Sequence, residues 1–111
     1  MGTQLDKKNK VEIDSKSLSD PKILIDNDTT RITFHQIRPG QQSGWHRHQY
    51  DYVGYHFQSS DVRVELVDGS TGSIKSDAEK ATFYSVGDGL EHNVTVVGDS
   101  DLIALEIEFK K

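Results

Sequence analysis

"GQQSGWHRHQYDYVGYH", residues 40–56, gathers three of the chain's five histidines and three of its four tyrosines. At its centre His46 and His48 are separated by one residue. Side chains of an extended strand alternate between its two faces, so these two imidazoles would share one face, roughly 7 Å apart along the strand. Histidines placed in this way indicate a set of metal ligands, a proton-handling pair or a chance grouping on a polar loop.

The composition limits the classes of protein to consider. The chain has 111 residues, enough for one domain with a small core, and a formal net charge of −5, which argues against a nucleic-acid surface. It has no cysteine, so a metal would have to bind histidine, carboxylate or phenol groups. No apolar run reaches the ~18 residues of a membrane span, and the polar start "MGTQLDKKNK" does not resemble a secretory signal. We therefore expect a cytoplasmic protein that binds neither nucleic acid nor membrane.

Short strands separated by turn signals run along most of the chain. Strand patterns occupy "KILID" (22–26), "RITFHQI" (31–37), "DVRVEL" (61–66), "ATFYS" (81–85), "HNVTVV" (92–97) and "LIALEIEF" (102–109). In the last of these, alternation predicts that Ile103, Leu105, Ile107 and Phe109 point inward and that Glu106 and Glu108 point to water. The pattern predicts an all-β sandwich or small barrel over residues 21–111, after an arm at 1–20 with one short strand at 10–14.

Other residues join the histidine pair by the same reasoning. If the alternation continues along the chain, Tyr52 and His56 lie on the histidine face. In "GDGLEHNV", residues 87–94, His92 follows a glycine turn at the start of a different strand. Two histidines from one strand and a third from another can converge inside a barrel. His35 has no partner motif, and we expect it to be structural or exposed.

These motifs resemble those of the cupin superfamily over roughly residues 30–109. Gly40, His46 and His48 match the start of the first cupin motif, G-x5-H-x-H-x3/4-E-x6-G, and Gly89 and His92 match the core of the second, G-x5-P-x-G-x2-H-x3-N. The chain looks most like the small single-domain cupins assigned to β-alanine degradation. The resemblance implies a double-stranded β-helix, or jelly-roll barrel, and a metal held by His46, His48 and His92.

The chain departs from the family pattern at the expected fourth ligand. The motif glutamate should follow His48 by four residues, but Tyr52 stands there, and alternation turns Asp51 away from the histidines. A phenol has a pKa of about 10, so Tyr52 is either a metal ligand as phenolate or a neutral hydrogen-bond donor in the pocket. Gly87 and Val96 replace the proline and asparagine of the second motif. The resemblance therefore implies three histidine ligands and leaves the fourth open.

The ligand type sets the expected function. Imidazoles suit one divalent transition-metal ion, of Fe, Mn, Ni, Cu or Zn, and three protein ligands leave an open position of the kind that catalytic sites use. We expect a mononuclear metalloenzyme of the dioxygenase, isomerase or lyase type that acts on a small polar metabolite, with Tyr52 and His56 as candidate catalytic residues.

Two alternatives remain, together with an expectation about assembly. The first alternative is a ligand-binding or sensing cupin whose metal anchors a carboxylate, and a weaker one is a metal-free scaffold. Because exposed sheet edges must be covered, we also expect a homodimer.

Overall fold

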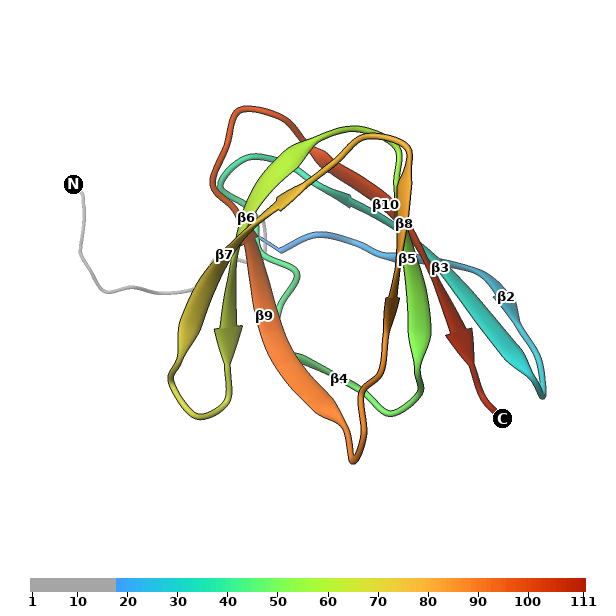
Figure 1. Cartoon of the computed structure of the whole chain (residues 1–111). Helices are drawn as coiled ribbons and strands as arrows, with labels where there is room; N and C mark the ends of the chain where they lie inside the picture. The colour runs from blue at the N-terminus through green and yellow to red at the C-terminus, as the bar shows by residue number, and fades with distance from the viewer. Residues whose placement is uncertain (1–17) are drawn as a thin grey trace.

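The computed structural model describes residues 18–111, and these form antiparallel strands without any helix (Figure 1). The all-β prediction is confirmed. The strands are β2 (Lys22–Asp26), β3 (Thr30–Ile37), β4 (His46–His48), β5 (Tyr52–His56), β6 (Ser60–Leu66), β7 (Thr71–Ser76), β8 (Lys80–Tyr84), β9 (Leu90–Val96) and β10 (Leu102–Phe109). The sequence patterns matched most of these, but β7 was not predicted. The expected strand at 10–14 lies outside the described residues, and the division at residue 20 stays a prediction.

Two sheets make up the fold. One has the order β2-β3-β10-β5-β8 and the other β4-β9-β6-β7, and the chain crosses between them at every link from β3 to β10 except β6–β7. In Figure 1 the two sheets stand on opposite sides of the molecule, with most of the crossing segments at the top. This alternate crossing gives the predicted double-stranded β-helix, and it brings β4 beside β9 although more than 40 residues separate them.

The core lies between the sheets. Ile37, Val62, Val96, Leu102 and Ala104 are buried together, and Val64 and Val94 pack against them. The side chains of β6 alternate, since Val62, Val64 and Leu66 line the interior while Arg63 is exposed. Apolar packing therefore fills the end of the interior where β10 begins and β9 ends, and the first residues of β9 are left for polar groups.

The predicted orientation of β10 is wrong. Leu102, Ala104 and Glu108 are buried, and Glu106 lines the interior, so the alternate set Ile103, Leu105, Ile107 and Phe109 lies on the outer face of the sheet. Either set of an alternating strand can point inward, and we had expected the more apolar set to do so. Burial of the glutamates is permitted because β3 presents Arg31 and His35 to them.

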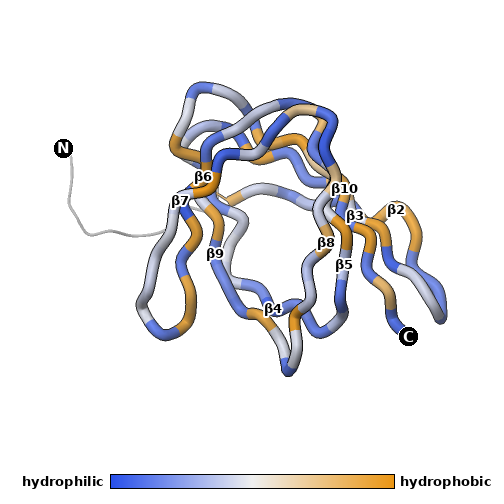
Figure 2. Tube along the Cα trace, viewed as in Figure 1, coloured by the Kyte–Doolittle hydropathy of each residue, from blue (hydrophilic) through white to orange (hydrophobic). Residues whose placement is uncertain are grey.

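The outer face of the five-stranded sheet is apolar. Figure 2 shows hydrophobic colour along β2, β3 and β10, whereas β4 and the adjoining part of β9 are hydrophilic. Ile25, Phe83 and Phe109 are all more than two-fifths exposed. No helix within residues 18–111 is long and apolar enough to cross a membrane.

Candidate metal centre

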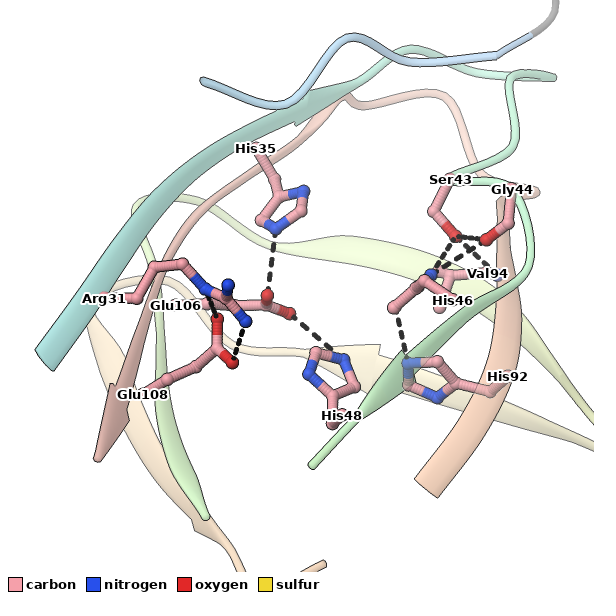
Figure 3. A network of polar contacts seen from close by, with 10 residues as sticks. All are labelled: Arg31, His35, Ser43, Gly44, His46, His48, His92, Val94, Glu106 and Glu108. Atoms are coloured by element: carbon pink, nitrogen blue, oxygen red, sulfur yellow. Dashed lines mark hydrogen bonds and ion pairs between the residues drawn. The ribbon is translucent and has the colours of Figure 1, made fainter. Parts of the chain in front are cut away.

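The pairing of β4 with β9 builds a cluster of three histidines. His46 lies directly opposite His92, and His48 lies opposite Leu90. Among the described residues, the potential ligand atoms of His46, His48 and His92 all lie within 4.8 Å of one another. His48 and His92 are buried and His46 is partly buried. Figure 3 shows the three rings converging from the two strands, as the two motifs predicted.

The loop before β4 orients the first ring. Gly44 takes a positive φ of 85°, and its carbonyl oxygen accepts a hydrogen bond from His46 Nδ1 at 2.8 Å. Ser43 fastens this loop to β9, because its hydroxyl accepts a bond from the Val94 backbone N–H at 3.0 Å. With Nδ1 protonated and engaged, His46 Nε2 carries the lone pair and points to the cluster. A backbone bond to the remote nitrogen is the usual way in which a protein orients a histidine ligand.

A glycine turn places the third ring. Arg47 points outward from β4, and its guanidinium donates to the Asp88 carbonyl oxygen at 2.6 Å. Gly89 lies against this guanidinium so closely that a β-carbon there would be 2.3 Å from a guanidinium nitrogen. Because residue 89 is a glycine, the Arg47 side chain can pack against the turn and hold it in place. His92 follows this turn in the chain.

The electrostatics of the cluster favour neutral imidazoles. Burial, with the neighbouring rings of His46 and His48, lowers the pKa of His92 to about 4. Burial also lowers the pKa of His48. Neutral imidazole is the form that binds a metal ion, so both rings are ready as ligands at neutral pH.

The arrangement of the nitrogen atoms fits a metal ion. His46 Nε2 and His92 Nε2 are 2.9 Å apart, close to the ~3.0 Å that separates two ligands at right angles on an ion with bonds of about 2.1 Å. His48 Nε2 is buried and has no hydrogen-bond partner among residues 18–111. A buried nitrogen without a partner is costly, and a cation at the cluster would satisfy it. The three histidines can therefore hold a metal ion.

A cavity of about 240 Å³ opens beside the histidines. Its far wall is apolar and comes from both sheets, with Val62, Val64, Leu66 and Leu102 among its lining residues. Its polar wall contains His46 and His92 and, from the five-stranded sheet, residues of β5, β3 and β10: Tyr52, His56, His35 and Glu106. The cavity has room for a small molecule with one polar and one apolar end.

Tyr52 and His56 both line this cavity, on the inner face of β5. The Tyr52 ring stacks on His48 with centroids 4.4 Å apart, and Tyr84 stacks on its other side. Burial, with the negative charge of Glu106, raises the pKa of Tyr52, which favours the neutral phenol. Burial lowers the pKa of His56, whose Nδ1 is buried without a hydrogen-bond partner in the described part of the chain. Their catalytic roles, and ligation by Tyr52, stay predictions.

Glu106 and His35 also belong to this site, although no sequence motif indicated it. His35 Nε2 lies 2.9 Å from Glu106 Oε1, and Glu106 Oε2 lies 3.9 Å from His48 Nε2 (Figure 3). Burial alone would raise the pKa of Glu106, but the hydrogen bond from His35 and the nearby rings of His48 and His46 keep it below its ordinary value. The sequence did contain an indication of this pairing. The even spacing of Arg31 and His35 places them on one face of β3, and that of Glu106 and Glu108 places them on one face of β10, so the two faces carry complementary polar groups. Asp51 does turn away, as predicted, and accepts a bond from the Val86 backbone N–H.

Comparisons with known proteins agree with this fold. No family model matches the chain. The chain is 29% identical over 90 residues to the β-alanine degradation protein BauB of Pseudomonas aeruginosa, a match that covers 81% of this chain and 92% of that protein. A solved cupin domain from Bordetella pertussis has a TM-score of 0.75 and 29% identity, over 84% of this chain and 94% of that one.

A third structure shares the fold alone. The DMSP lyase DddQ of Ruegeria pomeroyi has a TM-score of 0.62 but only 12% identity, over 93% of this chain and 52% of that one. The jelly-roll topology, the two motifs and these similarities show that the chain has the cupin fold and is similar to small cupins. Within that class it resembles the β-alanine degradation protein.

Proposed function

We propose that the protein is a metal-dependent cupin enzyme that acts on a small molecule with a carboxylate or carbonyl group and a short apolar portion. The observation that carries the proposal is the convergence of three imidazoles beside a mostly apolar cavity. The divalent transition-metal ion would be held by His46, His48 and His92, and when bound it supplies a Lewis acid with an open coordination position.

Residues that line the cavity would bind the substrate, donate a hydrogen bond to it and accept a proton from it. The apolar wall, with Val62, Val64 and Leu66, would exclude water and hold the apolar portion of the substrate. The Tyr52 hydroxyl, kept neutral by burial, is suited to donate a hydrogen bond to a substrate oxygen. The neutral ring of His56 can accept a proton from a substrate within the cavity.

The proposal is tested first by elemental analysis of tag-free protein purified without chelator, beside the His46→Ala/His48→Ala double variant. About one equivalent of Fe, Mn, Ni, Cu or Zn in the wild type alone is expected. The loaded protein is then tested for turnover of short-chain carboxylates and carbonyl compounds and for oxygen uptake. Absence of metal from both proteins after reconstitution would contradict the proposal.

A second candidate function is ligand binding without turnover, in which the metal anchors a carboxylate. It is favoured by the lack of a glutamate at position 52, which leaves the motif strand without a carboxylate on the histidine face. The two functions differ in one measurement. Turnover that is lost in His48→Ala supports the enzyme, whereas ligand binding to the metal-loaded protein without any product supports the binding protein.

We also propose that two copies pair through the outer face of the five-stranded sheet. Ile32, Ile107, Val53 and Phe83 are successive cross-strand neighbours on that face, and the outward side chains of the described strands β3, β10, β5 and β8 are uncharged. Two identical faces whose outward side chains are uncharged on these four strands can pack together there without repulsion between these acidic chains. Light scattering should give about twice the 12.5 kDa mass of the chain. The cytoplasmic location stays a prediction.

A further inference from the structure

The inner face of β10 carries two carboxylates with different partners. Glu108 is buried and receives two parallel hydrogen bonds from the Arg31 guanidinium, each 2.9 Å long. Glu106, whose side chain is 20% exposed, has no lysine or arginine in ion-pair contact within the described part of the chain. Its polar neighbours are histidines. In the described part of the chain Glu108 is therefore paired with a permanently charged guanidinium, whereas Glu106 is paired with imidazoles.

A buried carboxylate needs a compensating positive charge. A hydrogen bond with His35 Nε2 satisfies Glu106 Oε1, whereas Oε2 faces His48 Nε2 at 3.9 Å, beyond hydrogen-bond distance. A charge left without a partner in the interior is unfavourable, and the group is then driven to become neutral. A divalent cation at the three-histidine cluster would supply a permanent positive charge beside Glu106, since the cluster lies next to this carboxylate.

The two oxygens of Glu106 have different neighbours. Oε1 accepts the hydrogen bond from His35 Nε2, and this contact turns Oε2 toward the cluster, where it lies 3.9 Å from His48 Nε2 (Figure 3). Ligand atoms on one ion with bonds of about 2.1 Å lie about 3.0 Å apart at right angles and about 4.2 Å apart on opposite sides. The distance of 3.9 Å falls within that interval.

The neighbouring strand β5 leaves space for Glu106 to approach the histidine cluster. Gly54 of β5 is the cross-strand neighbour of Glu106, and as a glycine it adds no side chain to the cavity. Tyr52, which occupies the motif position of the usual glutamate, is instead stacked between the His48 and Tyr84 rings. The carboxylate that the motif strand lacks is thus available from β10.

We propose that Glu106 is the fourth protein ligand of the metal ion, and that His35 is a positioning residue that holds its carboxylate. This inference rests on the proposed metal site at His46, His48 and His92. It moves the carboxylate ligand from the first motif to the last strand of the barrel, and it leaves Tyr52 free to contact a substrate.

The test is a titration of metal-free, tag-free protein with Co²⁺, in which binding is measured by calorimetry and by visible absorption. Three proteins are compared: the wild type, Glu106→Gln, and Glu108→Gln as the matched control on the same face of the same strand. Loss of the ligand should weaken Co²⁺ binding at least about tenfold and change the shape of the visible bands, because the coordination shell changes. Glu108→Gln should bind Co²⁺ within threefold of the wild type, with unchanged bands.

The outcomes separate this inference from the proposed function. If the wild type itself does not bind Co²⁺, the proposed function fails. If the wild type binds and Glu106→Gln binds equally well, or binds more weakly with unchanged visible bands, Glu106 is not a ligand. Should Glu106→Gln be unfolded by circular dichroism, Glu106→Asp replaces it. That variant keeps the charge on a side chain one methylene shorter, and the same loss of affinity and change of bands is expected.

Discussion

Gly89 is the position at which one added methyl group should disturb both the fold and the metal centre. Its φ is +130°, a conformation that residues with a side chain rarely adopt. A β-carbon there would lie 2.3 Å and 2.5 Å from two guanidinium atoms of Arg47, the side chain that donates to the Asp88 carbonyl oxygen. In Gly89→Ala, the backbone must stay strained and Arg47 must move away.

The expected cost can be estimated from these contacts. Backbone strain of this kind costs on the order of 1–3 kcal/mol. Loss of the Arg47 hydrogen bond adds about 1 kcal/mol, and the lower entropy of an unfolded chain with alanine returns roughly 0.4–1 kcal/mol. We expect Gly89→Ala to lower the free energy of unfolding by about 2 kcal/mol, which for a chain of this size corresponds to a fall in Tm of roughly 10 °C.

Two other glycines supply the controls. Gly72 on β7 has an ordinary φ, and nothing lies within 4 Å of its added β-carbon, so Gly72→Ala should change the Tm little. Gly87 has a positive φ of 56° but open space, so Gly87→Ala isolates the cost of left-handed backbone, about 1 kcal/mol. Only Gly89→Ala adds the contact with Arg47.

The assay is thermal unfolding of the metal-free proteins, together with Co²⁺ titration. Because the turn leads directly into the pairing of β4 with β9, Gly89→Ala should also weaken Co²⁺ binding, whereas Gly72→Ala should not. Adding Arg47→Ala should change the Tm of Gly89→Ala less than it changes that of the wild type, since the hydrogen bond is already lost. A Gly89→Ala variant that melts within 1 °C of Gly72→Ala would refute the reasoning.

Three further predictions concern the ion pair, the stacked ring and the outer face. Arg31→Met leaves the buried Glu108 carboxylate without its bidentate partner and should lower the free energy of unfolding by about 3 kcal/mol in chemical denaturation, and Arg31→Met/Glu108→Leu should recover most of that loss. Tyr52→Phe keeps the ring stacked on His48, so Co²⁺ affinity should stay within threefold, and a larger loss would instead make Tyr52 a ligand. Phe83→Glu places a charge on the exposed outer face and should give a monomeric mass in light scattering, whereas a dimer that persists would place the interface elsewhere.

Most of the fold was predictable because its signals are local. Alternation over five to eight residues and glycine turns depend only on neighbours in the chain, and they located most of the strands. β7 was missed because its side chains are mostly exposed, so no buried face imposes an apolar pattern on "TGSIKS". The orientation of β10 was predicted wrongly because both of its faces contain apolar residues.

The members of the three-histidine cluster could be named from local spacing and the family resemblance, although the pairing of β4 with β9 is what brings them together. His46 and His48 share a face through the period of a strand, and His92 follows a turn that its glycines require, so each motif fixes its own geometry. The fourth carboxylate was decided only by the tertiary structure. Glu106 reaches the cluster because β10 lies between β3 and β5 in a register that places it near both His35 and His48. Pairing between strands about 70 residues apart depends on the packing of the whole barrel. A shift of one residue in the register of β10 would have turned the Glu106 side chain to the surface.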